Sequence, residues 1–161
     1  MPNQSLELIF KSEADTLSFA ESLAPYLEPG DTILLDGPVG AGKSFLSRAL
    51  IRSVLGHQED VPSPTFTLVQ TYETDKGEIW HCDLYRITNI GEIDERGLFE
   101  AFETAICLVE WPDRLADEAP SDAITIALTM DEKAGEERRV FLSGLTAKWH
   151  KRLNEFLDDN T

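Results

Sequence analysis

The 161-residue sequence is short of basic residues, with 14 Lys and Arg against 30 Asp and Glu and a formal net charge of −16. A protein that grips duplex DNA or folded RNA by its phosphates needs several Lys and Arg spread over one surface. The best basic clusters here are Arg138 with Arg139, and Lys148, Lys151 and Arg152. The second cluster fits the solvated face of an amphipathic helix. We therefore expect weak or no direct binding of isolated nucleic acid.

Cysteine is also scarce, and no apolar run approaches the roughly 18 residues of a membrane span. Cys82 and Cys107 lie in apolar, strand-like surroundings without the spacing of a metal or redox pair, which favours buried free thiols. The start, MPNQSLELIFKSE, lacks the basic region and long apolar segment of a signal peptide. We expect a cytoplasmic protein without membrane contact.

Strand-like and helix-like segments alternate along a chain whose length suits a single domain spanning residues 1–161. Ser12 and Asp15 form a capping-box pattern before a helix with Leu17 on its apolar face, and Pro25 should bend or end that helix. The alternation predicts an α/β fold: a largely parallel central sheet flanked by helices, with a C-terminal hairpin and helix. The expected strands are 5–10, 32–36, 65–73, 78–87, 105–111, 123–130 and 138–144, and the expected helices begin near residues 12, 44, 90 and 145.

The segment GPVGAGKS, from Gly37 to Ser44, matches the phosphate-binding pattern GxxxxGK[ST] and lies between an expected strand and an expected helix. Glycines let successive backbone N–H groups face phosphate oxygens, and the helix N-terminus adds partial positive charge. In this pattern Lys43 reaches the β and γ phosphates, and the Ser44 hydroxyl binds Mg²⁺. The flanking strand and helix argue against a chance glycine turn. The predicted nucleotide contacts are Gly37, Val39, Gly40, Ala41, Gly42, Lys43, Ser44 and Phe45.

Two acidic residues end expected strands. Asp83 closes EIWHCD, where the alternation of side chains puts His81 and Asp83 on one face. Glu110 follows the apolar run ICLV, which is typical of a buried strand that ends at a ligand site. Either acid alone could be an ordinary surface residue. Together, beside a phosphate loop, they are candidates for holding a metal ion or a water molecule.

Three further residues have both a functional and a structural interpretation. Thr65, in VPSPTFTLV, could sense a γ phosphate through Mg²⁺ as switch threonines do, or simply begin a strand. Arg86 could neutralise phosphate charge or pair with one of the many acids. His81 could relay a proton, but a packed, hydrogen-bonded histidine is favoured because the chain has no zinc-ligand spacing.

The ordered set GPVGAGKS, SPTFTLV, HCDLYR and VEWP resembles the TsaE (YjeE) family, small bacterial ATPases needed to make threonylcarbamoyladenosine in tRNA. The resemblance spans nearly the whole chain and implies a P-loop NTPase-like fold, ATP and Mg²⁺ as ligands, and TsaB and TsaD as partner proteins. It implies that Thr65 is switch-like, that Asp83 is the metal-side acid, that Glu110 serves hydrolysis and that Trp111 lies beside the nucleotide. Ser44 stands where many members have Thr, and either hydroxyl can bind Mg²⁺.

We therefore expect an ATPase with catalytic Lys43, Thr65 and Glu110, and with Ser44, Asp83 and Glu110 at the metal. Hydrolysis by the isolated protein should be slow, because Lys43 and Arg86 are the only basic side chains that the sequence offers for stabilising the transition state. Hydrolysis should be faster in the presence of the partner proteins. A small-molecule P-loop kinase is a weaker alternative, since no Arg-rich lid is evident, and a GTPase lacks its [NT]KxD signature. A nucleotide-gated interaction module, in which hydrolysis is incidental, is the third alternative.

Overall fold

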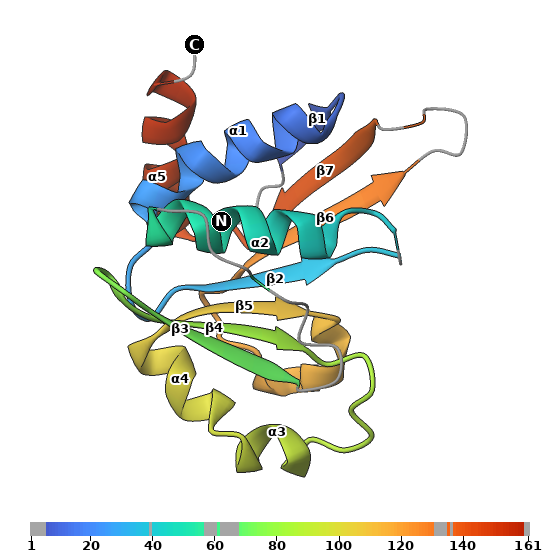
Figure 1. Cartoon of the computed structure of the whole chain (residues 1–161), viewed down its shortest axis with the longest axis vertical. Helices are drawn as coiled ribbons and strands as arrows, with labels where there is room; N and C mark the ends of the chain where they lie inside the picture. Colours follow the sequence, from blue (N-terminus) through green and yellow to red (C-terminus); the bar gives the residue numbers. More distant parts are fainter. Residues whose placement is uncertain are drawn as a thin grey trace.

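A seven-stranded mixed sheet forms the centre of the described structure, a computed structural model (Figure 1). It describes residues 6–38, 40–56, 61, 68–130, 135 and 137–159, without the side chains of 116 and 155–159. In spatial order the strands are β1 (Leu6–Phe10), β7 (Arg138–Ser143), β6 (Ile124–Met130), β2 (Thr32–Asp36), β5 (Ile106–Glu110), β4 (Gly77–Asp83) and β3 (Val69–Thr74).

The middle of the sheet is parallel and its edges are antiparallel. β6, β2, β5 and β4 run in parallel as successive neighbours, whereas β7 pairs antiparallel with β6, β1 with β7, and β3 with β4. The α/β fold with a largely parallel central sheet is therefore confirmed. The C-terminal hairpin is part of this sheet, because its first strand, β6, lies directly beside β2.

Helices cover both faces of the sheet (Figure 1). On one face lie α1 (Glu13–Leu23) and α2 (Lys43–Leu55), and the apolar residues of α5 (Ala147–Asp159) join the same core. The second core contains residues of α3 (Gly91–Glu95), α4 (Leu98–Thr104) and the 3-10 helix η2 (Pro112–Glu118). A short 3-10 helix, η1 (Ala24–Tyr26), contains Pro25 and follows the end of α1, as predicted.

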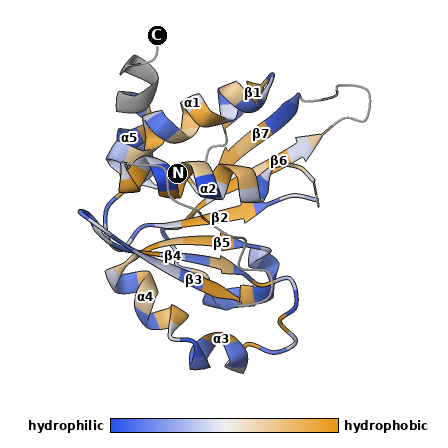
Figure 2. Ribbon diagram, in the orientation of Figure 1, coloured by the Kyte–Doolittle hydropathy of each residue, from blue (hydrophilic) through white to orange (hydrophobic). Residues whose placement is uncertain are grey.

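The two central strands are apolar along most of their length because helices cover both of their faces (Figure 2). Ile33 and Leu35 of β2 belong to the core under α1 and α2, whereas Leu34 between them belongs to the opposite core. Leu108 and Val109 of β5 divide between the two cores in the same way. Successive side chains of a strand point to opposite faces, so each of these strands anchors both helical layers.

The start of α1 differs from the prediction. Ser12 precedes the helix, but its side chain makes no capping hydrogen bond. The Asp15 carboxylate accepts a hydrogen bond from the Lys11 amide at 2.7 Å, so the expected capping box is wrong. Leu17 is 42% exposed, because the buried face of α1 follows Thr16 and Phe19, and Leu17 lies one residue off that face.

The basic residues of α5 also differ from the prediction. Lys148 Nζ lies 3.0 Å from Asp31 Oδ1 and 2.9 Å from Asp122 Oδ2. Arg152 pairs with Asp31 as well, and with Glu28 at 3.1 Å. Asp31 is only 2% exposed, so the two basic side chains compensate a buried carboxylate beside the start of β2. Lys148 and Arg152 are therefore not merely part of a solvated face.

The expectation for the two cysteines holds within the described structure. Cys82 and Cys107 are buried free thiols, and burial raises the pKa of Cys107 to about 12. Burial also raises the pKa of Cys82 well above its ordinary value. In the part of the chain that the structure describes, no helix is both long enough and apolar enough to cross a membrane.

The buried ion-pair cluster yields a stability prediction. Asp31→Asn should lower the free energy of unfolding by about 2 kcal/mol, because it removes the charge that compensates Lys148 and Arg152. Asp122→Asn is the matched control: its side chain is 50% exposed, so its effect should stay below about 1 kcal/mol. Urea unfolding measures both values. Equal effects of the two substitutions would contradict the structural role of Asp31.

Candidate active site

The phosphate-loop sequence connects β2 to α2, as predicted. β2 ends at Asp36, and α2 begins at Lys43 after its N-cap, Gly42, whose φ of 105° is in the left-handed region. Gly37 has a φ of 138°, and a Cβ at this position would lie 2.3 Å from the carbonyl oxygen of Leu128 in β6. A side chain at Gly37 would therefore clash with the sheet. Val39 lies outside the described residues.

Lys43 is buried although it is charged, with 5% of its surface exposed. Its Nζ donates a hydrogen bond to the Gly37 carbonyl at 2.5 Å and lies 3.5 Å from the ring centroid of Trp111. Burial lowers the pKa of Lys43, while nearby carboxylates, with Glu110 the most important, act in the opposite direction. The ammonium group is thus held between the loop and an aromatic ring, next to the strand-end acids.

Glu110 ends β5 and is 2% exposed. The Ser44 hydroxyl donates to its Oε1 at 3.0 Å, and His81 Nε2 lies 2.7 Å from its Oε2. His81 is fully buried, and its Nδ1 has no hydrogen-bond partner in the described structure. Since a buried N–H without an acceptor is costly, we assign the proton to Nε2, which then donates to the carboxylate. Both oxygens of Glu110 are thereby oriented.

His81 is packed and hydrogen-bonded, as the sequence predicts, but its partner was not predictable from the local pattern. His81 pairs with Leu108 in the parallel β4–β5 ladder, and Glu110 follows two residues later on the same face of β5. The contact therefore depends on the pairing of two strands that are separated by α3 and α4.

Asp83 ends β4 directly opposite Glu110 in the β4–β5 register. It is 6% exposed, and its Oδ1 accepts a hydrogen bond from the Tyr85 backbone at 3.0 Å. The two acids therefore lie at the carboxyl ends of neighbouring parallel strands, and β5 is also the neighbour of the strand that leads into the phosphate loop. Both acids also line the same cavity as the loop residues Gly40 and Gly42.

A cavity of about 440 Å³ is lined by residues of the phosphate loop, by the first residues of α2 and by both strand-end acids. Gly37 and Ala41 belong to the loop but do not line it, and Thr65 lies outside the described residues. Arg48 and Tyr85 also line the cavity, but they were not predicted from the sequence as site residues. Arg48 lies on α2 after Lys43, and the centroid of the Tyr85 ring lies 4.9 Å from that of the Trp111 ring. The cavity is lined by Gly40, Gly42, Lys43, Ser44, Phe45, Arg48, Asp83, Tyr85, Arg86, Glu110 and Trp111.

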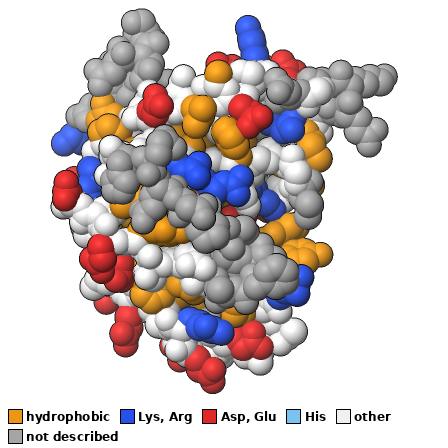
Figure 3. All heavy atoms as spheres, viewed as in Figure 1, with side chains coloured by type: hydrophobic (Ala, Val, Ile, Leu, Met, Phe, Trp, Pro, Cys, Tyr) orange, Lys and Arg blue, Asp and Glu red, His pale blue; other side chains and the backbone are white. Residues whose placement is uncertain are grey.

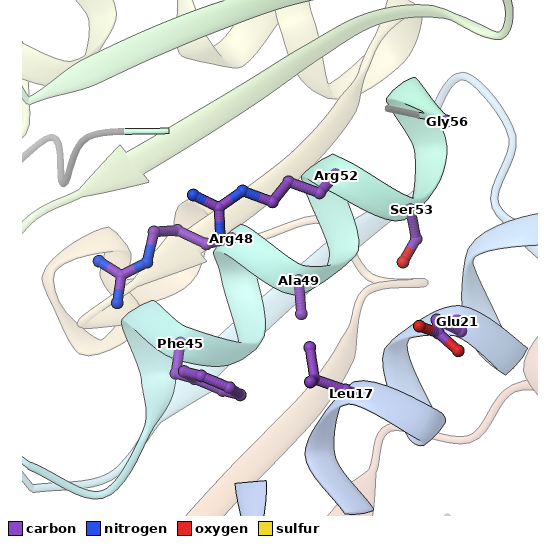
Figure 4. Close-up of a pocket in the computed structure, with 8 residues that line it drawn as sticks. All are labelled: Leu17, Glu21, Phe45, Arg48, Ala49, Arg52, Ser53 and Gly56. Atoms are coloured by element: carbon purple, nitrogen blue, oxygen red, sulfur yellow. The ribbon is translucent and has the colours of Figure 1, made fainter. Parts of the chain in front are cut away.

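A second cavity, of about 660 Å³, lies between α1 and α2 and shares Phe45 and Arg48 with the first (Figure 4). Leu17 of α1 faces Ala49 of α2, whereas Arg48 and Arg52 extend from α2 away from α1 (Figure 4). Lys and Arg side chains gather near the middle of the molecular face in Figure 3, with most of the visible acidic side chains nearer its rim. The acidic protein therefore has a locally basic surface.

The donor atoms beside the loop fit Mg²⁺ and a polyphosphate. Mg²⁺ prefers oxygen ligands and is commonly held by one or two carboxylates together with substrate phosphates and water. Ser44 Oγ and the Glu110 carboxylate already converge, and Asp83 stands next to Glu110 in the sheet. Within the described part of the chain, no three His, Cys, Asp or Glu side chains form a metal-binding group.

The contact between Lys43 and Trp111 predicts an optical signal. A phosphate bound in the loop would compete with the Trp111 ring for the Lys43 ammonium, so adding ADP should change tryptophan emission. The change should disappear in Trp111→Phe and persist in Trp149→Phe, because Trp149 is fully buried against α5 basic residues. A fluorescence titration tests this. An unchanged response in Trp111→Phe would move that ring away from the nucleotide.

The chain matches a known protein family over most of its length. A family model described as "Threonylcarbamoyl adenosine biosynthesis protein TsaE" matches residues 10–140. The tRNA threonylcarbamoyladenosine biosynthesis protein TsaE of Rickettsia bellii is 39% identical over 124 residues, 77% of this chain and 86% of that protein. The protein of the same name from Aquifex aeolicus is 38% identical over 133 residues, 82% of this chain and 93% of that protein.

A solved structure supports the fold. The crystal structure of YdiB from Bacillus subtilis superposes with a TM-score of 0.79 at 22% identity, covering 100% of this chain and 99% of that one. At this identity the likeness concerns the fold alone. The family match includes the loop and both strand-end acids, and together with these relatives it shows that the chain belongs to the TsaE family.

Proposed function

We propose that this protein is a cytoplasmic, Mg²⁺-dependent P-loop ATPase that supports threonylcarbamoyladenosine modification of tRNA together with TsaB and TsaD. The observation that carries the ATPase proposal is the link from Ser44 through Glu110 to His81, beside a buried Lys43. The names of the sequence relatives support the pathway. The choice of partner proteins rests on the resemblance of the four motifs to the TsaE family.

Binding would use Lys43, Ser44 and Asp83. The Lys43 ammonium now contacts a backbone carbonyl and an aromatic ring, which are weaker partners than a phosphate oxygen. Ser44 Oγ and the Asp83 carboxylate would hold the metal ion. When bound, ATP with Mg²⁺ supplies a transferable γ-phosphoryl group whose charge the metal partly neutralises. Trp111, which already contacts Lys43, would lie at the edge of the bound phosphates.

Glu110 would orient and deprotonate the attacking water. Ser44 and His81 each occupy one acceptor site on a different oxygen, so each oxygen keeps a further lone pair. A carboxylate fixed in this way can accept a hydrogen bond from water at a constant angle and then accept its proton. His81 and Ser44 thus position the carboxylate without consuming its capacity as a base.

Turnover by the isolated protein would be slow. Lys43 must exchange its contacts with Gly37 and Trp111 for phosphate oxygens, and this exchange uses part of the binding energy. A partner that favours the rearranged site would accelerate the reaction by shifting this equilibrium. The net charge of −16 would steer the protein towards a basic partner surface and away from bare tRNA.

One observation favours the alternative of a nucleotide-gated interaction module. Trp111 has a left-handed φ of 58°, contacts Lys43, and packs against Tyr85, which is 48% exposed. A phosphate that draws Lys43 away would disturb this aromatic pair and therefore alter an exposed surface. In that function nucleotide binding alone would suffice, and the chemistry of Glu110 would be incidental.

Two substitutions separate binding from hydrolysis. Lys43→Ala should weaken ATP binding at least ~10-fold by removing a charge-assisted contact. Glu110→Gln should leave ATP affinity within about threefold and sharply reduce phosphate release, because the amide is not a base. Calorimetry and a phosphate assay provide the measurements, with circular dichroism as the control for folding.

The outcomes distinguish the candidate functions. Unchanged ATP affinity in folded Lys43→Ala would overturn the site. A Glu110→Gln protein that loses hydrolysis yet still supports tRNA modification would favour the interaction module.

The partner proposal has its own test. Steady-state phosphate release should rise when TsaB and TsaD are added together, and this stimulation should weaken as salt screens the attraction of the acidic surface. Each component, including tRNA, is added singly and in combination near physiological salt. Stimulation by tRNA alone, with no effect of the two proteins, would contradict the proposal.

A further inference from the structure

The side of the phosphate loop that faces the sheet rests on the C-terminal hairpin, β6 and β7. A Cβ on Gly37 would lie 2.3 Å from the carbonyl oxygen of Leu128, which shows how closely the loop approaches β6. A Cβ on Gly40 would lie 3.7 Å from Cε of Met130, at the end of the same strand. The hairpin carries none of the sequence motifs, yet it is in contact with the loop.

Arg138, the first residue of β7, bonds the hairpin to the loop. Its Nε donates to the Ala41 carbonyl at 3.2 Å, and its Nη2 donates to the Gly40 carbonyl at 3.5 Å. Its Nη1 donates to the carbonyls of Gly135 at 2.7 Å and Glu137 at 3.0 Å, both within the β6–β7 connection. One guanidinium group therefore joins two segments that lie nearly a hundred residues apart in the chain.

These bonds fix the orientation of loop peptides. In a planar trans peptide the carbonyl and the following N–H point in opposite directions. Arg138 holds the Ala41 carbonyl on the hairpin side, so the Gly42 N–H points the other way. The peptide between Gly40 and Ala41 is held at both ends, because its carbonyl faces Arg138 and its N–H donates to the Pro38 carbonyl at 3.2 Å.

We propose that Arg138 is a positioning residue that preorganises the phosphate loop through the loop carbonyls that face the β6–β7 hairpin. The proposal rests on the proposed nucleotide-binding function, but its basis is the set of contacts with the Gly40 and Ala41 carbonyls. A cation on a carbonyl also polarises the peptide and strengthens its N–H as a donor to an anion. Arg138 lines a small cavity of about 220 Å³ together with Gly40, Ala41 and Gly42, on the side of the loop next to Leu128.

Arg139 is a matched control within the same strand. It carries the same charge, but it is exposed and, by the alternation of side chains along β7, points to the opposite face of the sheet from Arg138. Arg138→Gln and Arg139→Gln change the net charge equally. A loss of ATP affinity that is specific to Arg138→Gln therefore reports the contacts of Arg138 with the loop and not the electrostatic field of the whole protein.

The first measurement is ATP affinity by calorimetry on the full-length protein. Arg138→Gln should raise the dissociation constant about tenfold, whereas Arg139→Gln should change it by less than about twofold. Arg138→Lys keeps the charge but cannot bridge loop and hairpin with a planar fork, so its affinity should fall between these two. Equal losses at both positions, or no loss in a folded Arg138→Gln protein, would overturn the proposal.

The second measurement does not depend on ATP. Hydrogen–deuterium exchange of the segment 37–44, without nucleotide, should be faster in Arg138→Gln than in wild type and unchanged in Arg139→Gln. If the wild-type protein binds no ATP but exchange of segment 37–44 still rises in Arg138→Gln alone, the proposed nucleotide function is wrong and the contact between Arg138 and the loop is supported. If wild type binds ATP and neither readout moves, the inference fails. Should Arg138→Gln not fold, Arg138→Lys compared with Arg139→Lys gives the same decision.

Discussion

The parallel pairing of β2 with β5 is the constraint on which the site depends. Leu35 of β2 pairs with Glu110 of β5, so the strand-end acid stands one residue before the point where β2 gives way to the loop. This register brings the Glu110 carboxylate within 3.0 Å of the Ser44 hydroxyl at the start of α2. A slip of one residue would turn Glu110 to the other face of the sheet, into an apolar core. Apolar burial on both faces of β5 therefore determines the register of this strand and, with it, the position of the Glu110 carboxylate.

Each buried charged group of the site has its own hydrogen-bond or aromatic partners. An isolated buried ammonium or carboxylate is unfavourable, and each of these groups has polar partners. Lys43 has the Gly37 carbonyl and the Trp111 ring, and Glu110 has Ser44 and His81. The partners of Lys43 carry no net charge, so a more highly charged ligand can replace them. The arrangement satisfies both buried groups while leaving Lys43 able to exchange its contacts.

The sequence predicted the fold class, the strand–loop–helix position of the phosphate loop and the placement of an acid at the end of each of two strands, because these are local signals. Contacts between distant elements left no such signal. The partner of His81 depends on the β4–β5 register, and the pairing of Lys148 with Asp31 depends on where α5 packs. The capping-box prediction at Ser12 failed because Asp15 bonds to the preceding amide. Local patterns predict elements, whereas packing decides which side chains meet.

The part of the chain that carries the four motifs does not by itself contain all the contacts that hold the phosphate loop, because the β6–β7 hairpin supplies some of them. All four motifs precede β6, yet β6 occupies the sheet position beside β2, and its Leu128 carbonyl lies against Gly37. Without β6 and β7, one edge of β2 would be unpaired and the Arg138 bonds to the loop carbonyls would be absent. Support of this kind acts on backbone atoms and needs only one suitably placed side chain. A strand and a single arginine can therefore hold a phosphate loop in shape without leaving a motif in the sequence.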